Sequence, residues 1–215
     1  MTRFLITGVN RGIGAALKAA ALTDGHEVIG TTRDGRDGTL ALELSDPATV
    51  AAQLSDLSPI DVLINNAGII GPKAERQSPL SMDWNGIAET FAINSIAPLA
   101  VAQAALPALR QSVRPRILTV SSQMASFARP KSSQIASRAS KAAVNKVMQG
   151  LAVELKSEGI PVVLINPGWV RTDMGGPEAE EHAGDVAQGI LALAGRLTIQ
   201  DTGKFFRFTG EEFAF

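Results

Sequence analysis

The chain of 215 residues contains no cysteine and no tyrosine. Without cysteine, disulfides, thiolate nucleophiles and cysteine-ligated zinc are excluded. Only two histidines occur, His26 and His182, so a histidine-rich metal centre is excluded as well, and we expect no metal site. Without tyrosine, the protein has no phenol that could act as an acid or a base.

Charge of either sign is also scarce. Twenty lysines and arginines stand against 21 aspartates and glutamates, which leaves no positive excess for a nucleic-acid backbone or an anionic membrane. The first ten residues lack the apolar run of a signal peptide. The uncharged segment Phe91–Leu109 contains Asn, Gln and Pro, so we interpret it as a buried helix and not as a membrane span. We expect a cytoplasmic protein that binds neither nucleic acid nor membrane.

Hydrophobic residues make up 45% of the chain, which is enough for a sizeable core. Short apolar runs alternate with longer helical stretches. The expected strands are Arg3–Thr7, His26–Thr32, Thr39–Leu44, Ile60–Asn65, Arg116–Ser122, Val162–Pro167 and Gly203–Phe208. The expected helices are Gly12–Leu22, one that begins at Asp46 and Pro47, Ser81–Leu109 with Ser81 as its cap, Ile135–Ser157 and Gly184–Ala194.

Strands that are apolar on both faces and separated by helices predict a parallel sheet covered on both sides. Because crossovers between parallel strands are right-handed, the helices must lie on both faces of the sheet. The length and the absence of a linker favour one domain over residues 1–215. The predicted fold class is therefore α/β, a single Rossmann-type doubly wound domain with a seven-stranded parallel sheet, whose ligand site lies at the carboxyl ends of the strands.

A glycine-rich segment, TGVNRGIG (Thr7–Gly14), joins the first strand to the first helix. In this position Gly8 allows a tight turn, Gly12 lets the backbone approach a pyrophosphate, and Gly14 lets the helix pack on the strand. The exposed N–H groups and the helix dipole favour a negative charge there. Glycines at such a turn can also be purely structural. The second segment, NNAG (Asn65–Gly68), directly follows the fourth strand, and its small residues would let the chain pass close to a ribose.

These two segments, together with two later ones, resemble the short-chain dehydrogenase/reductase family. SRASKAAVN (Ser137–Asn145) matches the family's Y-x-x-S-K-A-A-x-N except at its first residue, and NPGWVRTDM (Asn166–Met174) matches its P-G-x-x-x-T segment. The resemblance spans Arg3–Phe208, and the SSQMAS and DTGKFF segments look most like small carbonyl reductases of the C-factor and sniffer kind. It implies an NAD(P)-dependent oxidoreductase that acts on CH–OH and C=O groups of a small molecule.

The resemblance also implies roles for individual residues. The catalytic set would be Asn94, Ser122, Ser137 and Lys141, and the ammonium of Lys141 would also bind the ribose hydroxyls of the cofactor. The other implied cofactor contacts are Gly8, Asn10, Arg11, Gly12, Ile13, Gly14, Arg33, Leu44, Asn66, Ala67, Gly68, Pro167, Gly168, Val170 and Thr172.

The departure from the family lies at Ser137, where the family carries a tyrosine. In the family this phenol protonates the carbonyl oxygen as hydride arrives. Ser137 and Lys141 share one helix face because they are four residues apart, but an aliphatic hydroxyl is a far weaker acid and is shorter by a ring. Loss of a positioned general acid typically costs about 10²–10⁴-fold in rate.

Cofactor preference can be predicted from charge. An acid at the end of the second strand would bind the ribose hydroxyls of NAD, but this chain has Thr32 and Arg33 there, with Arg11 in the glycine loop. Two guanidinium groups can hold a ribose 2′-phosphate. Asp34 could be such an acid and would then weaken the preference for NADP, unless it lies one residue too far beyond the strand end. We therefore expect NADP in preference to NAD.

Two functions remain open from the sequence. The first is an NADP-dependent carbonyl reductase or alcohol dehydrogenase that is impaired by the missing tyrosine or that uses a water-relayed proton; Ser137 could also be a sporadic or engineered replacement. The second is a non-catalytic NADP-binding sensor or scaffold. His182 could replace the proton donor, although a surface position is favoured. We interpret Trp84 and Trp169 as packing residues, with Trp169 also able to floor the substrate pocket.

Oligomerisation is expected from two apolar helices. Ser81–Leu109 and Ile135–Ser157 carry more small and apolar residues than one sheet face needs. In the family these helices pair across a two-fold axis, so we expect a homodimer or homotetramer with a self-complementary interface.

Overall fold

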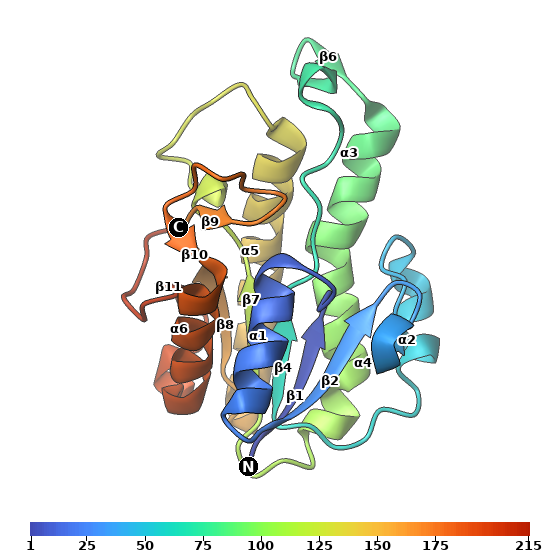
Figure 1. Cartoon of the computed structure of the whole chain (residues 1–215), viewed down its shortest axis with the longest axis vertical. Helices are drawn as coiled ribbons and strands as arrows, with labels where there is room; N and C mark the ends of the chain where they lie inside the picture. The colour runs from blue at the N-terminus through green and yellow to red at the C-terminus, as the bar shows by residue number, and fades with distance from the viewer.

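The computed structural model describes the whole chain, Met1–Phe215, and contains a seven-stranded parallel sheet between two layers of helices (Figure 1). The strands run in the order β11-β8-β7-β4-β1-β2-β3. Their bounds are β1 Arg3–Thr7, β2 Glu27–Thr32, β3 Leu40–Ala41, β4 Val62–Asn65, β7 Arg116–Val120, β8 Val162–Asn166 and β11 Phe205–Arg207. Every pairing between neighbours in this sheet is parallel, which confirms the predicted fold class.

The two faces of the sheet are covered by different helices. Helices α1 (Gly12–Thr23) and α6 (Ala183–Arg196) cover one face, and α2 (Val50–Gln53), α4 (Ala97–Leu109) and α5 (Ile135–Leu155) cover the other. Successive strand residues point to opposite faces. Strands β1, β4, β7, β8 and β11 therefore each contribute to two buried clusters, one of 21 residues against α1 and α6 and one of 20 residues against the other helices.

Short elements occupy the connections between the main ones. They are η1 Arg36–Gly38, η2 Pro47–Thr49, η3 Ala74–Arg76, β5 Gln77–Ser78, β6 Ser81–Met82, η5 Gln123–Ala125, η6 Lys156–Glu158, β9 Val170–Arg171, β10 Glu181–His182 and η7 Ile199–Asp201. The expected cap Asp46 is present, since its carboxylate accepts a hydrogen bond from the Ala48 N–H at the start of η2.

The long helix predicted from Ser81 begins later. Ser81 pairs with Ser78 in a small antiparallel hairpin, and the helix cap is Asp83, whose carboxylate accepts from the Gly86 N–H at 3.0 Å. Helix α3 (Trp84–Phe91) then continues through a π-helical segment, η4 (Ala92–Ile96), into α4. The extra residue in the π turn is the kind of local widening that recurs at functional sites.

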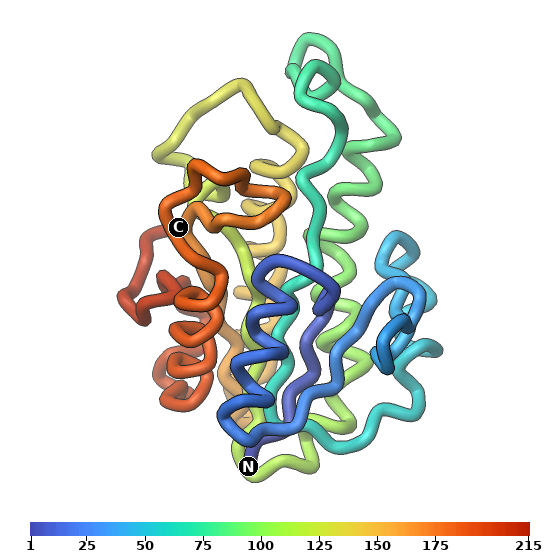
Figure 2. The backbone as a smooth tube through the Cα atoms, viewed as in Figure 1, coloured from blue at the N-terminus to red at the C-terminus, as the bar shows by residue number.

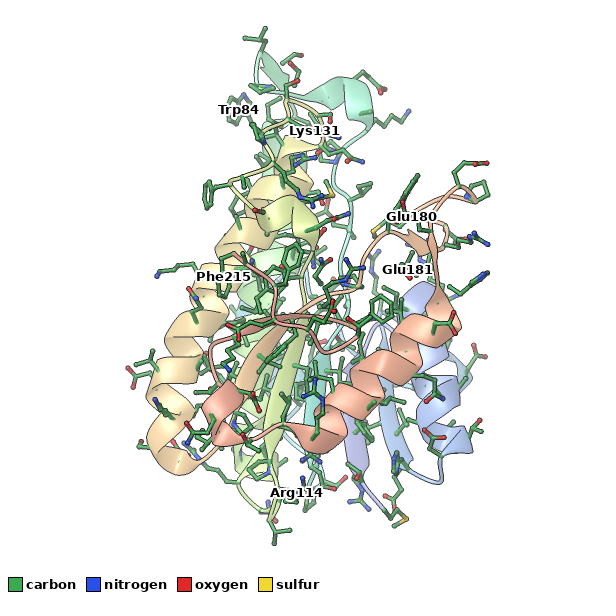
Figure 3. The ribbon with its side chains drawn as sticks, turned by 90° about the vertical axis from the view of Figure 1, so that its left-hand side faces the viewer. Trp84, Arg114, Lys131, Glu180, Glu181 and Phe215 are labelled. Atoms are coloured by element: carbon green, nitrogen blue, oxygen red, sulfur yellow. The ribbon has the colours of Figure 1, made fainter.

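The run from α3 to α4, Trp84–Leu109, is long and apolar enough to cross a membrane by length and composition, yet 56% of its most apolar window is buried inside the protein. It is therefore a core helix, as expected from its polar residues and prolines. Trp84 is not a packing residue, because it is 76% exposed and projects from the surface at the start of α3 (Figure 3).

Other element bounds also differ from expectation. The second strand begins at Glu27, the third is reduced to Leu40–Ala41, and the last is Phe205–Arg207. The backbone trace (Figure 2) shows the N-terminus at the amino ends of the strands and the loops that follow the strands at the opposite, carboxyl ends. These loops come from distant parts of the chain and meet because parallel strands all end on the same side.

Candidate functional site

A cleft of about 570 Å3 opens at the carboxyl edge of the sheet. It is lined by the segments that follow β1, β2, β3, β4, β7 and β8 and by the start of α5. Every residue expected to contact the cofactor lines this cleft, as do Ser122, Ser137 and Lys141. Asn94 is the one expected site residue that does not line it.

The glycine loop is shaped by close backbone contacts. Gly8 has a φ of +72°, and a Cβ there would lie 3.0 Å from the Cα and Cβ atoms of Ala67. A Cβ on Gly14 would lie 2.0 Å from the Gly8 carbonyl oxygen, so no side chain fits. The first turn of α1 has no side-chain cap at Arg11 and no acidic residue. Its N–H groups are therefore open to an anion from the cleft.

Hydrogen bonds tie the glycine loop to the segment after β4. The Thr7 hydroxyl accepts from the N–H groups of Asn66 and Ala67, both at 3.0 Å. The Asn66 amide donates to the carbonyls of Thr7 at 2.9 Å and Gly8 at 3.2 Å. Two neighbouring strand ends are thereby held as one wall of the cleft.

Asn94 lies behind this wall, in η4, and is 1% exposed. Its Oδ1 accepts from the Ile69 N–H at 2.9 Å, and its Nδ2 donates to the Ile69 carbonyl at 2.8 Å and to the Ser140 hydroxyl at 3.0 Å. Asn94 therefore positions the segment after β4 and connects it to α5.

The end of the cleft beside β7 carries three of the four expected catalytic side chains, Ser122, Ser137 and Lys141. The Ser122 hydroxyl caps η5 by accepting from the Met124 N–H at 3.1 Å. Ser137 is 8% exposed and lies one helical turn before Lys141 on α5. The Lys141 ammonium donates to the Val120 carbonyl at 2.8 Å and has no carboxylate within ion-pair distance. Desolvation by the surrounding protein lowers the pKa of Lys141 to about 8.

Asn166 orders two of the lining segments at once. It is 1% exposed, and its Oδ1 accepts from the Gln123 N–H at 3.2 Å and from the Gly168 N–H at 3.0 Å. The loop that carries Ser122 and the loop that begins at Pro167 are therefore fixed relative to one another. The sequence motif contained this residue, but only the structure shows what its side chain does.

The opposite end of the cleft, after β2, is rich in charge. Arg33 pairs with Glu43 at 3.4 Å, and both side chains are substantially exposed. Asp34 accepts two bonds from Arg36 Nε at 2.9 Å and one from its Nη2 at 2.7 Å. These bonds hold the pKa of the Asp34 carboxyl well below its usual range. The sequence reasoning missed Arg36, although the D-x-R spacing could have suggested a turn that brings the two side chains together.

The structure also places His182, considered as a proton donor, and Trp169, considered as a floor of the substrate pocket. His182 is exposed, does not line the cleft, and has its Nε2 3.3 Å from the guanidinium of Arg171. Trp169 lines the cleft, is 46% exposed and donates from Nε1 to the Gly175 carbonyl at 2.8 Å. The indole thus borders the opening and is held by the loop that follows β9.

Known proteins share both the sequence and the fold. The family profile described as short chain dehydrogenase matches residues 43–183. The C-signal protein of Myxococcus xanthus is 41% identical over 155 residues, which cover 72% of this chain and 92% of that protein. The 3-oxoacyl-(acyl-carrier-protein) reductase FabG of Escherichia coli K12 is 31% identical over 211 residues, with 90% and 82% covered.

Among solved structures, the carbonyl reductase Sniffer of D. melanogaster superposes with a TM-score of 0.91 at 27% identity. The match covers 100% of this chain and 100% of that one. The NADPH-bound carbonyl reductase from chicken fatty liver gives a TM-score of 0.87 at 27% identity, with 100% of this chain and 99% of that one covered. The profile match and the two relatives cover most of the chain. The chain therefore belongs to the short-chain dehydrogenase/reductase family, whose members are oxidoreductases acting on CH–OH and C=O groups.

Proposed function

We propose that this protein transfers hydride between NADPH and a small carbonyl or alcohol substrate. The observation that carries the proposal is the convergence of six strand-end segments on one cleft, with an uncapped helix N-terminus at one point and the side chains of Ser122, Ser137 and Lys141 at another. This arrangement provides a place for a pyrophosphate and, separately, a place for a reacting carbonyl.

The residues present fit a dinucleotide. The N–H groups of the first turn of α1 face the cleft with no acidic side chain to oppose a pyrophosphate. Gly68 lies beside the Lys141 ammonium, since a Cβ there would be 3.6 Å from it. The ammonium uses one of its three N–H donors on the Val120 carbonyl, so two remain for ribose hydroxyls. The NADPH-bound chicken enzyme and an NADP-bound protein from Burkholderia multivorans, both with this fold, support the same placement.

The charge beyond the ribose favours NADP over NAD. Arg11, Arg33 and Arg36 all line the cleft, and a guanidinium binds phosphate more strongly than a hydroxyl. Arg11 and Arg33 have carboxylate partners only at 3.4 Å and are largely exposed. Such pairs contribute little, so both guanidinium groups are free to turn toward a 2′-phosphate. Asp34 is already occupied by Arg36 and is a poor ribose acceptor.

When bound, NADPH supplies the hydride. The protein's part is to hold the carbonyl oxygen, for which the Ser122 hydroxyl is placed at the end of β7, and to provide a proton as negative charge develops on that oxygen. No phenol is available for the second task, because the chain contains no tyrosine. We expect reduction that is slow for this family.

The test is to titrate the protein with NADPH and NADH by fluorescence or calorimetry and then to follow NADPH oxidation with a panel of aldehydes, ketones and quinones. Tight NADPH binding with slow oxidation on some carbonyls supports the proposal. Absence of NADPH binding would exclude it.

The second candidate, a non-catalytic NADP-binding sensor or scaffold, is favoured by a single observation: the family's tyrosine position holds Ser137, whose side chain cannot itself serve as the acid. NADPH binding without any oxidation, including in a Ser137→Tyr variant, would support this alternative.

A further inference from the structure

The missing phenol leaves the question of which group gives the proton, and the residues lining the cleft restrict the answer. Arginine does not release protons near neutral pH. Asp34, after β2, and Glu43, after β3, have pKa values below their usual range and are ionised. Asp173 pairs with Arg11 at 3.4 Å on the exposed rim. His182 lies outside the cleft.

This leaves one ionisable side chain at the β7 end of the cleft. The lining residues there are Ser121, Ser122, Met124, Gln134, Ser137 and Lys141, of which only Lys141 carries an exchangeable proton on an ionised group. Its ammonium uses one of three N–H donors on the Val120 carbonyl, so two remain for other acceptors.

We propose that Lys141 is itself the proton donor of the reduction, with the Ser137 hydroxyl and a solvent molecule beside it passing the proton toward the carbonyl oxygen. The inference rests on the proposed NADPH-dependent carbonyl reduction. Ser137 is suited to the relay because it lies on the same face of α5, one turn before Lys141, and also lines the cleft.

The step balances. The carbonyl carbon gains a hydride, the π electron pair of the C=O bond moves to the oxygen, and the oxygen accepts the proton that leaves Lys141. The lysine is left as a neutral amine, which regains a proton from solvent before the next turnover. In the direction of alcohol oxidation the same amine accepts the proton.

The groups packed around the ammonium are polar but carry no charge. Val120 of β7 presents a carbonyl, and Gly68, beside the ammonium, presents backbone, while Asn94 of η4 lies just behind with an amide. No charged side chain contributes to the shift of the Lys141 pKa, which desolvation alone lowers to about 8. An acid with a pKa near the working pH is the most effective proton donor. Reduction therefore falls as pH rises above about 8.

Chemical rescue tests the assignment. Lys141→Ala, assayed in single turnovers at saturating NADPH, should be slower than the parent by about 10²–10⁴-fold. Methylammonium and ethylammonium should restore part of the rate, and a more acidic primary ammonium such as 2-fluoroethylammonium should restore more at equal occupancy. Tetramethylammonium has the charge but no proton and should restore nothing. NADPH fluorescence titrations under the same conditions provide a readout independent of turnover.

Two further variants separate proton transfer from charge and from folding. Lys141→Arg keeps the positive charge and should bind NADPH yet lose the rate, and Ser137→Ala should lose a smaller part of the rate with NADPH affinity unchanged. Circular dichroism checks that each variant is folded. Equal rescue by tetramethylammonium, or parent-like reduction by Lys141→Arg, overturns the proton-donor role alone. A parent protein that binds NADPH but reduces no carbonyl overturns both this inference and the proposed function.

Discussion

Asn94 holds both backbone polar groups of Ile69, accepting from its N–H at 2.9 Å and donating to its carbonyl at 2.8 Å. The contact joins the π-helical turn η4 to the segment that follows β4, 25 residues earlier in the chain. The side chain is 1% exposed, so neither bond can be replaced readily by water. Asn94 thus shapes one wall of the cleft from behind.

Replacing Asn94 with alanine should therefore destabilise the protein and loosen this wall. Each buried group of Ile69 left without a partner costs about 1–3 kcal/mol. We expect a lower free energy of unfolding in urea and weaker NADPH binding. Gln103→Ala, an exposed change on α4, is the matched control and should change stability by less than about 0.5 kcal/mol. Unchanged stability of Asn94→Ala would contradict the structural role.

NADPH should bind more tightly than NADH, because arginines line the adenosine end of the cleft. Arg33→Ala should cost about 1.5–3 kcal/mol of NADPH affinity, the range for a hydrogen bond to a charged group, with little change for NADH. Calorimetric titration measures both. Arg114→Ala is a matched control, since Arg114 lies at the opposite end of the molecule (Figure 3) and donates to the Gly195 carbonyl. Equal affinities for the two cofactors would refute the charge argument.

Ser137→Tyr should raise carbonyl reduction by roughly 10²–10⁴-fold. The new phenol would lie one turn before the Lys141 ammonium, which favours the phenolate and so lowers its pKa. Ser137→Phe fills the same space without a hydroxyl and should show no gain. Initial rates with NADPH on the most active carbonyl decide the comparison. A phenylalanine variant as fast as the tyrosine variant would mean that packing, and not proton donation, limits the parent.

The stability of the protein without cofactor should rise with pH in the alkaline range. The folded-state pKa of Lys141 is about 8, against an ordinary value of 10.5. Between these values the unfolded chain binds the extra proton, so the free energy of unfolding rises by up to about 1.4 kcal/mol per pH unit. The cost of charging Lys141 is fully present below pH 8. Urea unfolding of the parent and of Lys141→Met should differ in slope over this window, while Lys146→Met, an exposed change on α5, should follow the parent.

The chain should form a dimer or tetramer in solution. Trp84 on α3 and Val153 on α5 are 76% and 74% exposed, and both belong to the helices whose excess of apolar residues suggested self-association. Light scattering at micromolar concentration should give a multiple of 22.5 kDa, and Val153→Glu should shift it toward the monomer. Val113→Glu, the same change at a 96% exposed site outside these helices, should not. A monomeric parent would refute the prediction.

Much of the site could be read from the sequence because it consists of strand ends. Apolar runs specify the strands, and parallel strands of one sheet must end at one edge, so the segments after Thr7, Asn65, Val120 and Asn166 were bound to meet. Their glycines and small residues predicted close backbone approaches. The structure contains these approaches between Gly8 and Ala67 and between Gly14 and the Gly8 carbonyl.

Boundaries and side-chain partners were decided only by tertiary structure. Ser81 and Asp83 are both good helix caps by residue type, and the hairpin between Ser78 and Ser81 determines that Asp83 takes the role. The pairing of Asp34 with Arg36 depends on a tight turn after β2, which the D-x-R spacing allows but does not specify. Whether Asn94 faces the cleft or its back wall depends on the rotation of the π turn in η4.

The sequence by itself determined the doubly wound sheet, the family and the absence of a phenol, because all three follow from local pattern and residue type. Only the tertiary structure decided that His182 lies away from the cleft and that the Lys141 ammonium is desolvated at the β7 end of the cleft. Those properties depend on how segments distant in the chain enclose a side chain. Enclosure shifts the pKa of a side chain because its charged form loses hydration. The order of residues along a helix does not specify that enclosure.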